Sequence, residues 1–235
     1  MSTKRGRGRP PIDDLIMFEG MYYILRTGCP WRDLPREFGC WQSVYTRYRR
    51  WCKSGLWKRI LAKLAKSRMG KCRSIDCSHV KVHRDGANPS GGQKAQLMGK
   101  TKGGLNTKIA AMVATLGRVV GLELAAGNTQ DAQACELFFD EVRGQWVLAD
   151  KAFDIDELRG KLAKHGCMAC IPPNSNRKNQ YYYDEELYKR RHVIENFFGR
   201  IKIYRRIATR YEKLAETYMG FVTIAAILDW LRWRF

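Results

Sequence analysis

The chain has 235 residues and a formal net charge of +20, with 43 Lys and Arg against 23 Asp and Glu. Its hydrophobic content of 45% is enough to bury a core, which excludes a chain that is disordered by composition. The length allows one ordinary domain and a small module. So large an excess of positive charge goes beyond what solubility requires and favours a polyanionic partner, above all nucleic acid.

Two further classes are disfavoured by the sequence. No stretch approaches 18 consecutive apolar residues, the longest candidate being residues 221–228, and the N-terminus lacks an apolar signal core. Eight cysteines are scattered along a chain that can fold without cross-links, so they are expected to be reduced thiols. We therefore expect a soluble cytosolic protein with neither a membrane partner nor a small-molecule substrate.

The N-terminal residues 1–11 are predicted to be a flexible basic arm. Arginine and glycine alternate there, and this pattern forms neither a helix nor a packed strand. The segment 7–10 also matches the core of an AT-hook, in which glycine lets the backbone enter a narrow minor groove. The alternative is a solvated tail that meets only phosphates. The candidate DNA contacts in the arm are Arg5, Arg7 and Arg9.

Residues 12–67 are predicted to be a helix-turn-helix domain. Apolar residues at helical spacing predict helices over 12–26, 41–52 and 57–64, with a short helix or turn between 30 and 39. The second of these helices has one face rich in Arg, Gln and Thr, which suits a major groove. The alternative is a plain helical bundle with a solvated charged face. The candidate DNA contacts are Gln42, Ser43, Thr46, Arg47, Arg49 and Arg50.

After a linker predicted at 68–74, alternating strands and helices predict an α/β domain over 75–235. The element order is three strands, helix, strand, helix, strand and helix, which is typical of an RNase H-like fold with a mixed five-stranded sheet flanked by helices. The predicted strands cover 72–82, 107–114, 119–125, 146–149 and 167–171, and the predicted helices cover 131–142, 155–165, 184–206 and 216–230.

Two aspartates occupy positions that a purely structural role does not explain. Asp76 lies inside the first predicted strand, where a carboxylate is unfavourable without a ligand or partner. Asp150 follows a buried strand at its carboxyl end, the edge at which α/β sheets place their sites.

The helix predicted over 184–206 carries a polar stripe. Tyr188, Arg191, Glu195 and Lys202 stand at offsets 0, 3, 7 and 14, so an ideal helix places them within about 60° of one another. The apolar residues of the segment fall on the opposite face, so the helix can pack and still present chemistry. The alternative is a solvated basic face with an ion pair between Glu195 and Arg191.

These residues resemble the signature of the IS4 and IS5 groups of bacterial insertion-sequence transposases, in which Tyr, Arg, Glu and Lys have this spacing. Segments 26–35, 103–108 and 148–154 are similar to the IS5 branch. The resemblance covers nearly the whole chain. It implies that Asp76, Asp150 and Glu195 form a catalytic DDE triad, with Tyr188, Arg191 and Lys202 at the DNA near the cut. Only 44 residues separate Asp150 from Glu195, too few for the large β-rich insertion of some IS4 relatives.

Three carboxylates also suit the chemistry by themselves. Cutting a phosphodiester requires a water deprotonated near neutral pH and neutralisation of a 3′-oxygen leaving group. Two Mg²⁺ ions about 3.5–4 Å apart do both and prefer oxygen ligands. We expect Asp76 to bridge the metals while Asp150 and Glu195 hold one each, with Mn²⁺ able to replace Mg²⁺.

Weaker signals remain in two places. Residues 81–108 are interpreted as a DNA-contacting hairpin with Lys100, Lys102 and Lys108, the alternative being a mobile solvated loop. Cys167, Cys170 and His165 suggest zinc, but the spacing lacks a second ligand pair, so zinc is not expected. His79 and His83 are weak candidates for a general base.

Together these features predict an insertion-sequence transposase. It would bind terminal inverted repeats, cleave DNA by metal-dependent hydrolysis and join the 3′-OH ends to target DNA, as a homodimer on paired ends. It would work in the bacterial cytoplasm, associated with the nucleoid. Two rival interpretations are an RNase H-like nuclease or resolvase without strand transfer, and a domesticated DNA-binding regulator.

Overall fold

The first helix of the structure begins and ends at residues that cap it. The computed structural model describes residues 12–66, 70–178 and 180–232, so Arg5, Arg7 and Arg9 lie outside the described residues. The Asp13 carboxylate accepts the Leu15 amide at 2.8 Å and caps the first helix, which ends at Gly28 with φ +73°. The elements of this part are α1 (Asp14–Thr27), η1 (Trp31–Asp33), η2 (Arg36–Phe38), α2 (Trp41–Lys53) and α3 (Leu56–Ala65).

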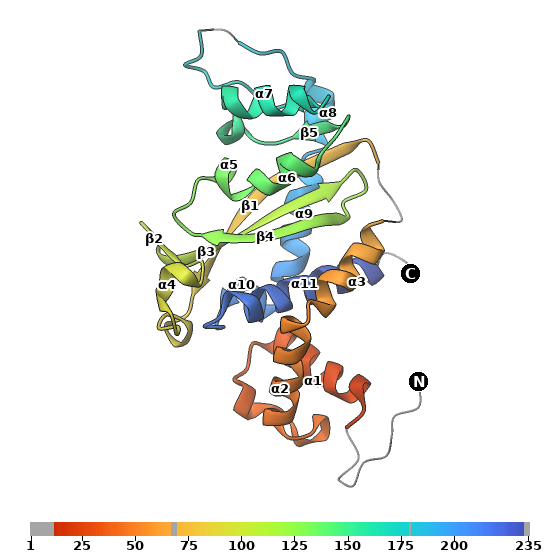
Figure 1. Ribbon diagram of the computed structural model, residues 1–235, viewed down its shortest axis with the longest axis vertical. Coiled ribbons are helices and arrows are strands. Elements are labelled where there is room, and N and C mark those ends of the chain that lie inside the picture. Colours follow the sequence, from red (N-terminus) through yellow and green to blue (C-terminus); the bar gives the residue numbers. More distant parts are fainter. Residues whose placement is uncertain (1–11, 67–69, 179, 233–235) are drawn as a thin grey trace.

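A mixed sheet fills the middle of the molecule, with helices on both faces (Figure 1). Its central path runs β2-β3-β1-β5-β6, with β4 beside β3 and β7 beside β1. The pairs β1/β3, β2/β3 and β3/β4 are antiparallel, whereas β1/β5, β1/β7 and β5/β6 are parallel. The strands are β1 (Cys72–Val82), β2 (Gly99–Thr101), β3 (Gly104–Ala114), β4 (Val119–Ala126), β5 (Trp146–Leu148), β6 (Met168–Cys170) and β7 (Thr209–Arg210).

The sheet has seven strands, so the prediction of five strands was wrong in number. The five predicted strands are present as β1, β3, β4, β5 and β6. The other two are short: β2 shares one edge of β3 with β4, and β7 shares one edge of β1 with β5. This is possible because β1 and β3 have 11 residues each and can pair with two short strands in succession. β1 also begins at Cys72, inside the segment predicted as a linker.

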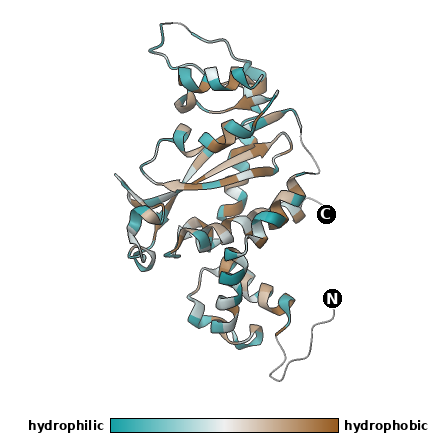
Figure 2. Ribbon diagram, in the orientation of Figure 1, coloured by the Kyte–Doolittle hydropathy of each residue, from teal (hydrophilic) through white to brown (hydrophobic). Residues whose placement is uncertain are grey.

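Side chains of β3 alternate between two apolar cores, as the period of a strand requires. Ile109, Ala111 and Val113 belong to the core that contains the N-terminal helices, and Ala110 and Met112 belong to the core on the opposite face. In Figure 2 the hydrophobic colouring accordingly concentrates on the strands and the helix faces against them. The sheet is therefore buried on both sides.

The first core joins the N-terminal helices to the rest of the chain. The Tyr48 ring on α2 stacks on Phe221 of the last helix, with ring centroids 4.4 Å apart. Trp31 stacks on the same ring at 5.9 Å. That last helix, α11 (Ala215–Arg232), packs against α2, α3, α9 and β4. The N-terminal helices and the sheet thus share one core.

Two segments that were predicted as continuous helices are each divided into shorter helices in the structure. The segment 184–206 is split because the amides of Arg190 and Arg191 bond three residues back, to Leu187 and Tyr188, and because Tyr204 is extended and buried. The segment 131–142 is split at Cys135, which is fully buried. The remaining helices of the described residues are η3 (Arg84–Gly86), α4 (Gly92–Ala95), α5 (Asp131–Ala134), α6 (Glu136–Glu141), η4 (Lys151–Phe153), α7 (Asp156–Lys164), α8 (Glu185–Lys189), α9 (His192–Lys202) and α10 (Arg205–Ala208).

Candidate active site

Asp76 lies in the middle of β1, on the face that α9 covers. Both of its carboxylate oxygens are bonded: Oδ1 accepts the Cys77 amide at 2.7 Å, and Oδ2 accepts Nη1 of Arg191 at 2.9 Å. Burial raises the pKa of Asp76, the Cys77 amide and Arg191 lower it, and the charge of Asp150 raises it. This carboxyl is thus held in a partly buried site by one cation and near one other carboxylate.

Asp150 follows β5, which runs parallel to β1 and places the end of β5 near Asp76. The Asp150 carboxylate accepts the Ala152 amide at 2.8 Å and caps η4. Its charge raises the pKa of Asp76 and also that of Tyr188, so it lies within electrostatic reach of both. The predicted proximity of the two aspartates therefore agrees with the structure.

Glu195 lies in the first turn of α9 and is joined to Asp76 through Arg191. Nη2 of Arg191 donates to Oε1 of Glu195, while Nη1 of the same guanidinium donates to Asp76. The Arg191 side chain is only 17% exposed, whereas that of Glu195 is 56% exposed. The ion pair of Arg191 with Glu195, which the sequence offered as the alternative to a catalytic stripe, is thus present, and it includes Asp76 as well.

Of the other two residues of the stripe, Tyr188 lies beside Arg191 and Lys202 contacts β1. The Arg191 guanidinium lies 5.8 Å from the centre of the Tyr188 ring, which in turn packs edge-on against Tyr183 at 5.6 Å. Nζ of Lys202 donates to Oγ of Ser78 at 2.6 Å and to the His79 carbonyl at 3.0 Å. Burial lowers the pKa of Lys202. The Arg191 bridge and the Lys202 contacts were not predicted, because pairings between distant segments have no local signal.

The donor set suits a hard cation, because all three side chains are carboxylates. Within the described ranges 12–66, 70–178 and 180–232, however, no three His, Cys, Asp or Glu side chains lie close enough to hold one ion as they stand. Arg191 lies between two of the three carboxylates. The residues fit a divalent cation in chemistry, and closing on it requires side-chain movement.

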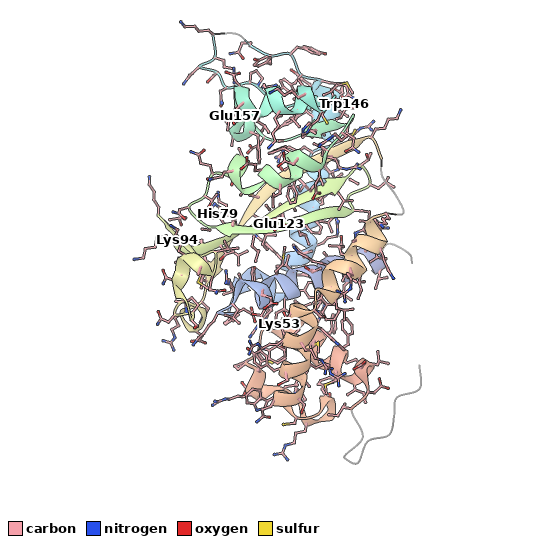
Figure 3. All side chains as sticks on the ribbon, viewed as in Figure 1. Lys53, His79, Lys94, Glu123, Trp146 and Glu157 are labelled. Atoms are coloured by element: carbon pink, nitrogen blue, oxygen red, sulfur yellow. The ribbon has the colours of Figure 1, made fainter. Side chains whose placement is uncertain are left out.

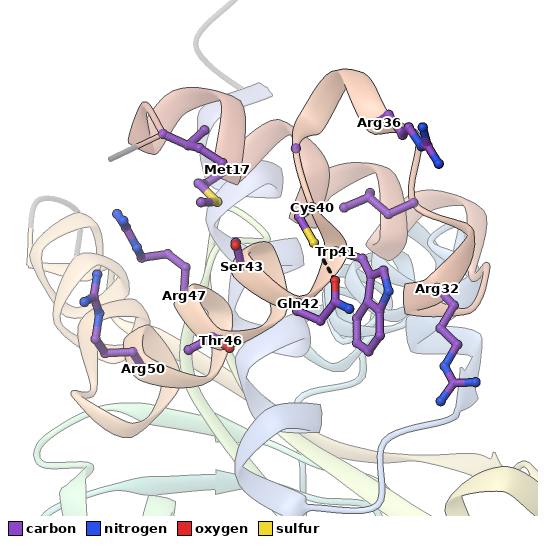
Figure 4. A pocket seen from close by; sticks show the side chains of 13 residues that line it. Met17, Arg32, Arg36, Cys40, Trp41, Gln42, Ser43, Thr46, Arg47 and Arg50 are labelled. Atoms are coloured by element: carbon purple, nitrogen blue, oxygen red, sulfur yellow. Dashed lines mark hydrogen bonds between the residues drawn. The ribbon is translucent and has the colours of Figure 1, made fainter. Parts of the chain in front are cut away.

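A separate hollow of about 1180 Å³ lies in the N-terminal helices, at the start of α2 (Figure 4). Exposed Arg32 and Arg36 border it on one side and Arg50 on the other, with Gln42 and Ser43 between them. Thr46 and Arg47 also line it, and Arg47 donates to Asp14 of α1. Arg49 is exposed outside this hollow, with its guanidinium 5.9 Å from the Tyr45 ring.

The predicted DNA contacts of residues 81–108 are divided in the structure. Lys100 and Lys102 are exposed at the β2–β3 hairpin, and Lys94 projects from α4 nearby (Figure 3). Lys108 is buried instead, and its Nζ donates to the Thr129 carbonyl at 2.6 Å and to Asp131 at 2.5 Å. The Lys108 side chain therefore differs from the expectation, because its ion pair turns it into the fold. The segment itself contains η3, α4 and β2.

The residues considered for zinc have separate partners. Sγ of Cys170 donates to the Asp184 carbonyl, and Sγ of Cys167 donates to the His165 carbonyl. Nδ1 of His165 lies 2.9 Å from the Phe139 carbonyl.

Among the described residues no helix is long and apolar enough to cross a membrane.

Comparison with known proteins gives two family models along the chain. The model described as "Transposase DDE domain" matches residues 68–230, and the one described as "Putative transposase of IS4/5 family" matches residues 1–61. The residues matched by the DDE domain model include all three carboxylates of the site.

Individual relatives agree with these models. The putative transposase for insertion sequence element IS6501 of Brucella ovis is 37% identical over 130 residues, which are 54% of this chain and 100% of that protein. An uncharacterised 16.2 kDa protein of insertion element IS402 from Burkholderia cepacia is 34% identical over 94 residues, which are 39% of this chain and 63% of that protein.

The fold is also similar to a solved structure. The piggyBac transposase in its synaptic complex with hairpin DNA superposes with a TM-score of 0.58 at 11% identity, covering 95% of this chain and 67% of that one. Because the DDE model spans most of the chain and the IS6501 relative is matched over its full length, this protein belongs to the DDE transposases of insertion sequences.

Proposed function

We propose that Asp76, Asp150 and Glu195 are the DDE triad of this transposase and that they cut DNA at the ends of the element. One observation carries the proposal: Asp76 of β1 and Glu195 of α9 share the Arg191 guanidinium, and the charge of Asp150 at the end of β5 acts on Asp76, although the three carboxylates are far apart in sequence. A purely structural role does not explain three carboxylates beside the central strand of a sheet. We place the protein in the IS5 branch on the motif resemblance.

Each carboxylate would have a defined part in the reaction. The three side chains would hold the divalent cations, and the Cys77 amide would orient Asp76. Bound Mg²⁺, or Mn²⁺ in its place, would supply a hydroxide near neutral pH and neutralise the leaving 3′-oxygen in a two-metal mechanism. The liberated 3′-OH would then attack target DNA. Tyr188 would lie beside the DNA at the cut, next to Asp150.

The helical part would recognise the terminal inverted repeats. We assign residues 12–67 to a helix-turn-helix domain, with α2 entering a major groove, and residues 1–11 to a basic arm. The catalytic domain would extend from β1 onward, and β1 starts at Cys72, inside the linker expected at 68–74. The hollow at the start of α2 supports this, since Arg32, Arg36 and Arg50 border it and are exposed. Guanidinium groups at such a surface suit phosphate oxygens.

Two ends of an element must be processed together, so we propose that a homodimer acts on paired ends. The host compartment would be the bacterial cytoplasm, with the protein associated with the nucleoid through its DNA partner. A mass measurement that finds one protein in a complex of two ends would contradict the dimer.

The triad is tested by replacing Asp150. Asp150→Ala should abolish Mg²⁺-dependent cleavage of a duplex that carries the terminal repeat, while binding of that duplex persists. Unchanged cleavage by Asp150→Ala would remove this residue from the triad. Cleavage by the wild-type protein without any joining of ends would favour a nuclease, and binding without cleavage would favour a regulator.

A further inference from the structure

The Arg191 guanidinium and a divalent cation need the same carboxylate oxygens. Asp76 gives one oxygen to the Cys77 amide and the other to Arg191, which also holds Glu195. A metal ligated by Asp76 and Glu195 would therefore lie against a positive charge that is already paired with both groups, and like charges repel. The two cations exclude one another in this arrangement.

We propose that Arg191 is a competitive latch on the catalytic carboxylates, and that a DNA phosphate releases it. This inference rests on the proposed function of the triad and adds a mode of regulation to it. Arg191 forms its bridge only while both carboxylates are free of metal, so metal binding requires the guanidinium to move away. DNA and metal then favour each other's binding.

Phosphate is the partner that suits the released side chain. A guanidinium binds a carboxylate or a phosphate through two parallel hydrogen bonds, so a phosphodiester can replace what Arg191 loses at Asp76 and Glu195. Arg191 is 17% exposed and lies in the turn between α8 and α9, beside the exposed carboxylate of Glu195. DNA that reaches the cleavage site would thus meet this side chain.

The consequence is a reciprocal coupling. If DNA raises the affinity for the metal by some factor, the metal raises the affinity for DNA by the same factor. In such linked sites, one ligand typically changes the affinity for the other by roughly 5–150-fold. The device would keep the hydrolytic site inactive on the free protein and complete it on DNA.

The chain contains a matched arginine that bridges carboxylates for structural reasons. Nε of Arg177 donates to Asp154 at 2.7 Å, and Nη1 donates to Asp156 at 2.6 Å. Asp154 also accepts Nε of Arg159 and the Asn174 amide, and its side chain is fully buried. This cluster ties the segment after β6 to α7 and is separate from the triad, so Arg177→Gln is a control for loss of an arginine bridge as such.

The test measures Mn²⁺ affinity in the full-length protein from the electron paramagnetic resonance signal of free Mn²⁺. Wild type, Arg191→Gln, Arg191→Lys and Arg177→Gln are compared with and without a terminal-repeat duplex. Without DNA, Arg191→Gln should bind Mn²⁺ about tenfold more tightly than wild type, within the usual range of coupled sites. Arg177→Gln should match wild type. The duplex should tighten Mn²⁺ binding to wild type and leave the affinity of Arg191→Gln nearly unchanged.

Equal or weaker Mn²⁺ binding by Arg191→Gln would overturn the latch. If that variant does not fold, as judged by its circular dichroism, Arg191→Lys decides, because lysine cannot bridge both carboxylates in the same geometry and should bind Mn²⁺ more tightly than wild type. The triad proposal fails separately: wild type would then bind no Mn²⁺ with or without DNA, or Asp150→Ala would bind it equally well.

Discussion

Asp76 combines an unfavourable location with partners that make it tolerable. Its side chain is 18% exposed on a strand that packs on both faces, and burial is the main cause of its raised pKa. Because the pKa of such a carboxyl is higher in the folded protein, its protonated form is favoured more strongly in the folded protein than in the unfolded chain. Its stabilisation is therefore complete below the unfolded pKa and is lost as pH rises through the higher folded pKa.

Asp76→Asn removes this pH dependence. We expect the free energy of unfolding of the variant, relative to wild type, to increase between about pH 3 and pH 7, because only the wild type must ionise a buried carboxyl. Urea denaturation at several pH values with a chelator present measures the difference. A difference that stays constant or falls with rising pH would show that Asp76 is not destabilised by burial.

At the scale of elements, the face of β1 opposite α9 is covered by α5. Sγ of Cys77 on β1 lies 3.4 Å from Sγ of Cys135, which ends α5. Both cysteines are reduced in the structure. This contact places α5 directly behind the strand that carries Asp76.

Mild oxidation should record this packing as a cross-link. With diamide as the oxidant, we expect a disulfide between Cys77 and Cys135, because their sulfur atoms are close and disulfides form only between residues that lie together. Peptide mapping under non-reducing conditions identifies the bond, and Cys135→Ser is the control. A dominant bond between any other pair of cysteines would contradict the position of α5.

The sequence predicted these elements better than their interruptions. Alternating and helical patterns were enough to locate the five main strands and the N-terminal helices. The spacing of Arg191, Glu195 and Lys202 was enough to single out the polar face of α9. The burial of Lys108 and the strand β7 depend on contacts between distant segments. No local pattern reports such contacts, which is why the Arg191 bridge to Asp76 could not be predicted.

For the whole molecule, the main feature is the junction between the N-terminal helices and the catalytic part. Nε of Arg206 on α10 donates to Glu212 at 2.7 Å, and both side chains are buried. Nη1 of Arg206 also donates to the carbonyls of Gly28 and Cys29, at the end of α1. Arg206, paired with Glu212, therefore joins the two parts in addition to their shared apolar core.

Breaking this pair should destabilise the molecule as a unit. Glu212→Ala leaves the Arg206 charge buried without its carboxylate, which costs about 3–5 kcal/mol of unfolding free energy. Urea denaturation should show one cooperative transition at a lower midpoint. Glu186→Ala is the control, because its ion pair with Lys189 is exposed and should contribute almost nothing. Equal effects of the two substitutions would contradict a structural role for the junction.

The central claim is that the three carboxylates cut and join DNA, and one measurement tests it most directly. The purified protein and its Glu195→Gln variant are incubated with Mg²⁺ and a labelled duplex from the DNA that flanks its own gene, together with a second duplex as target, and the products are sequenced. We predict cleavage at the repeat boundary and joining to the target by the wild type, with both lost in the variant. Cleavage and joining that persist in Glu195→Gln would contradict the account.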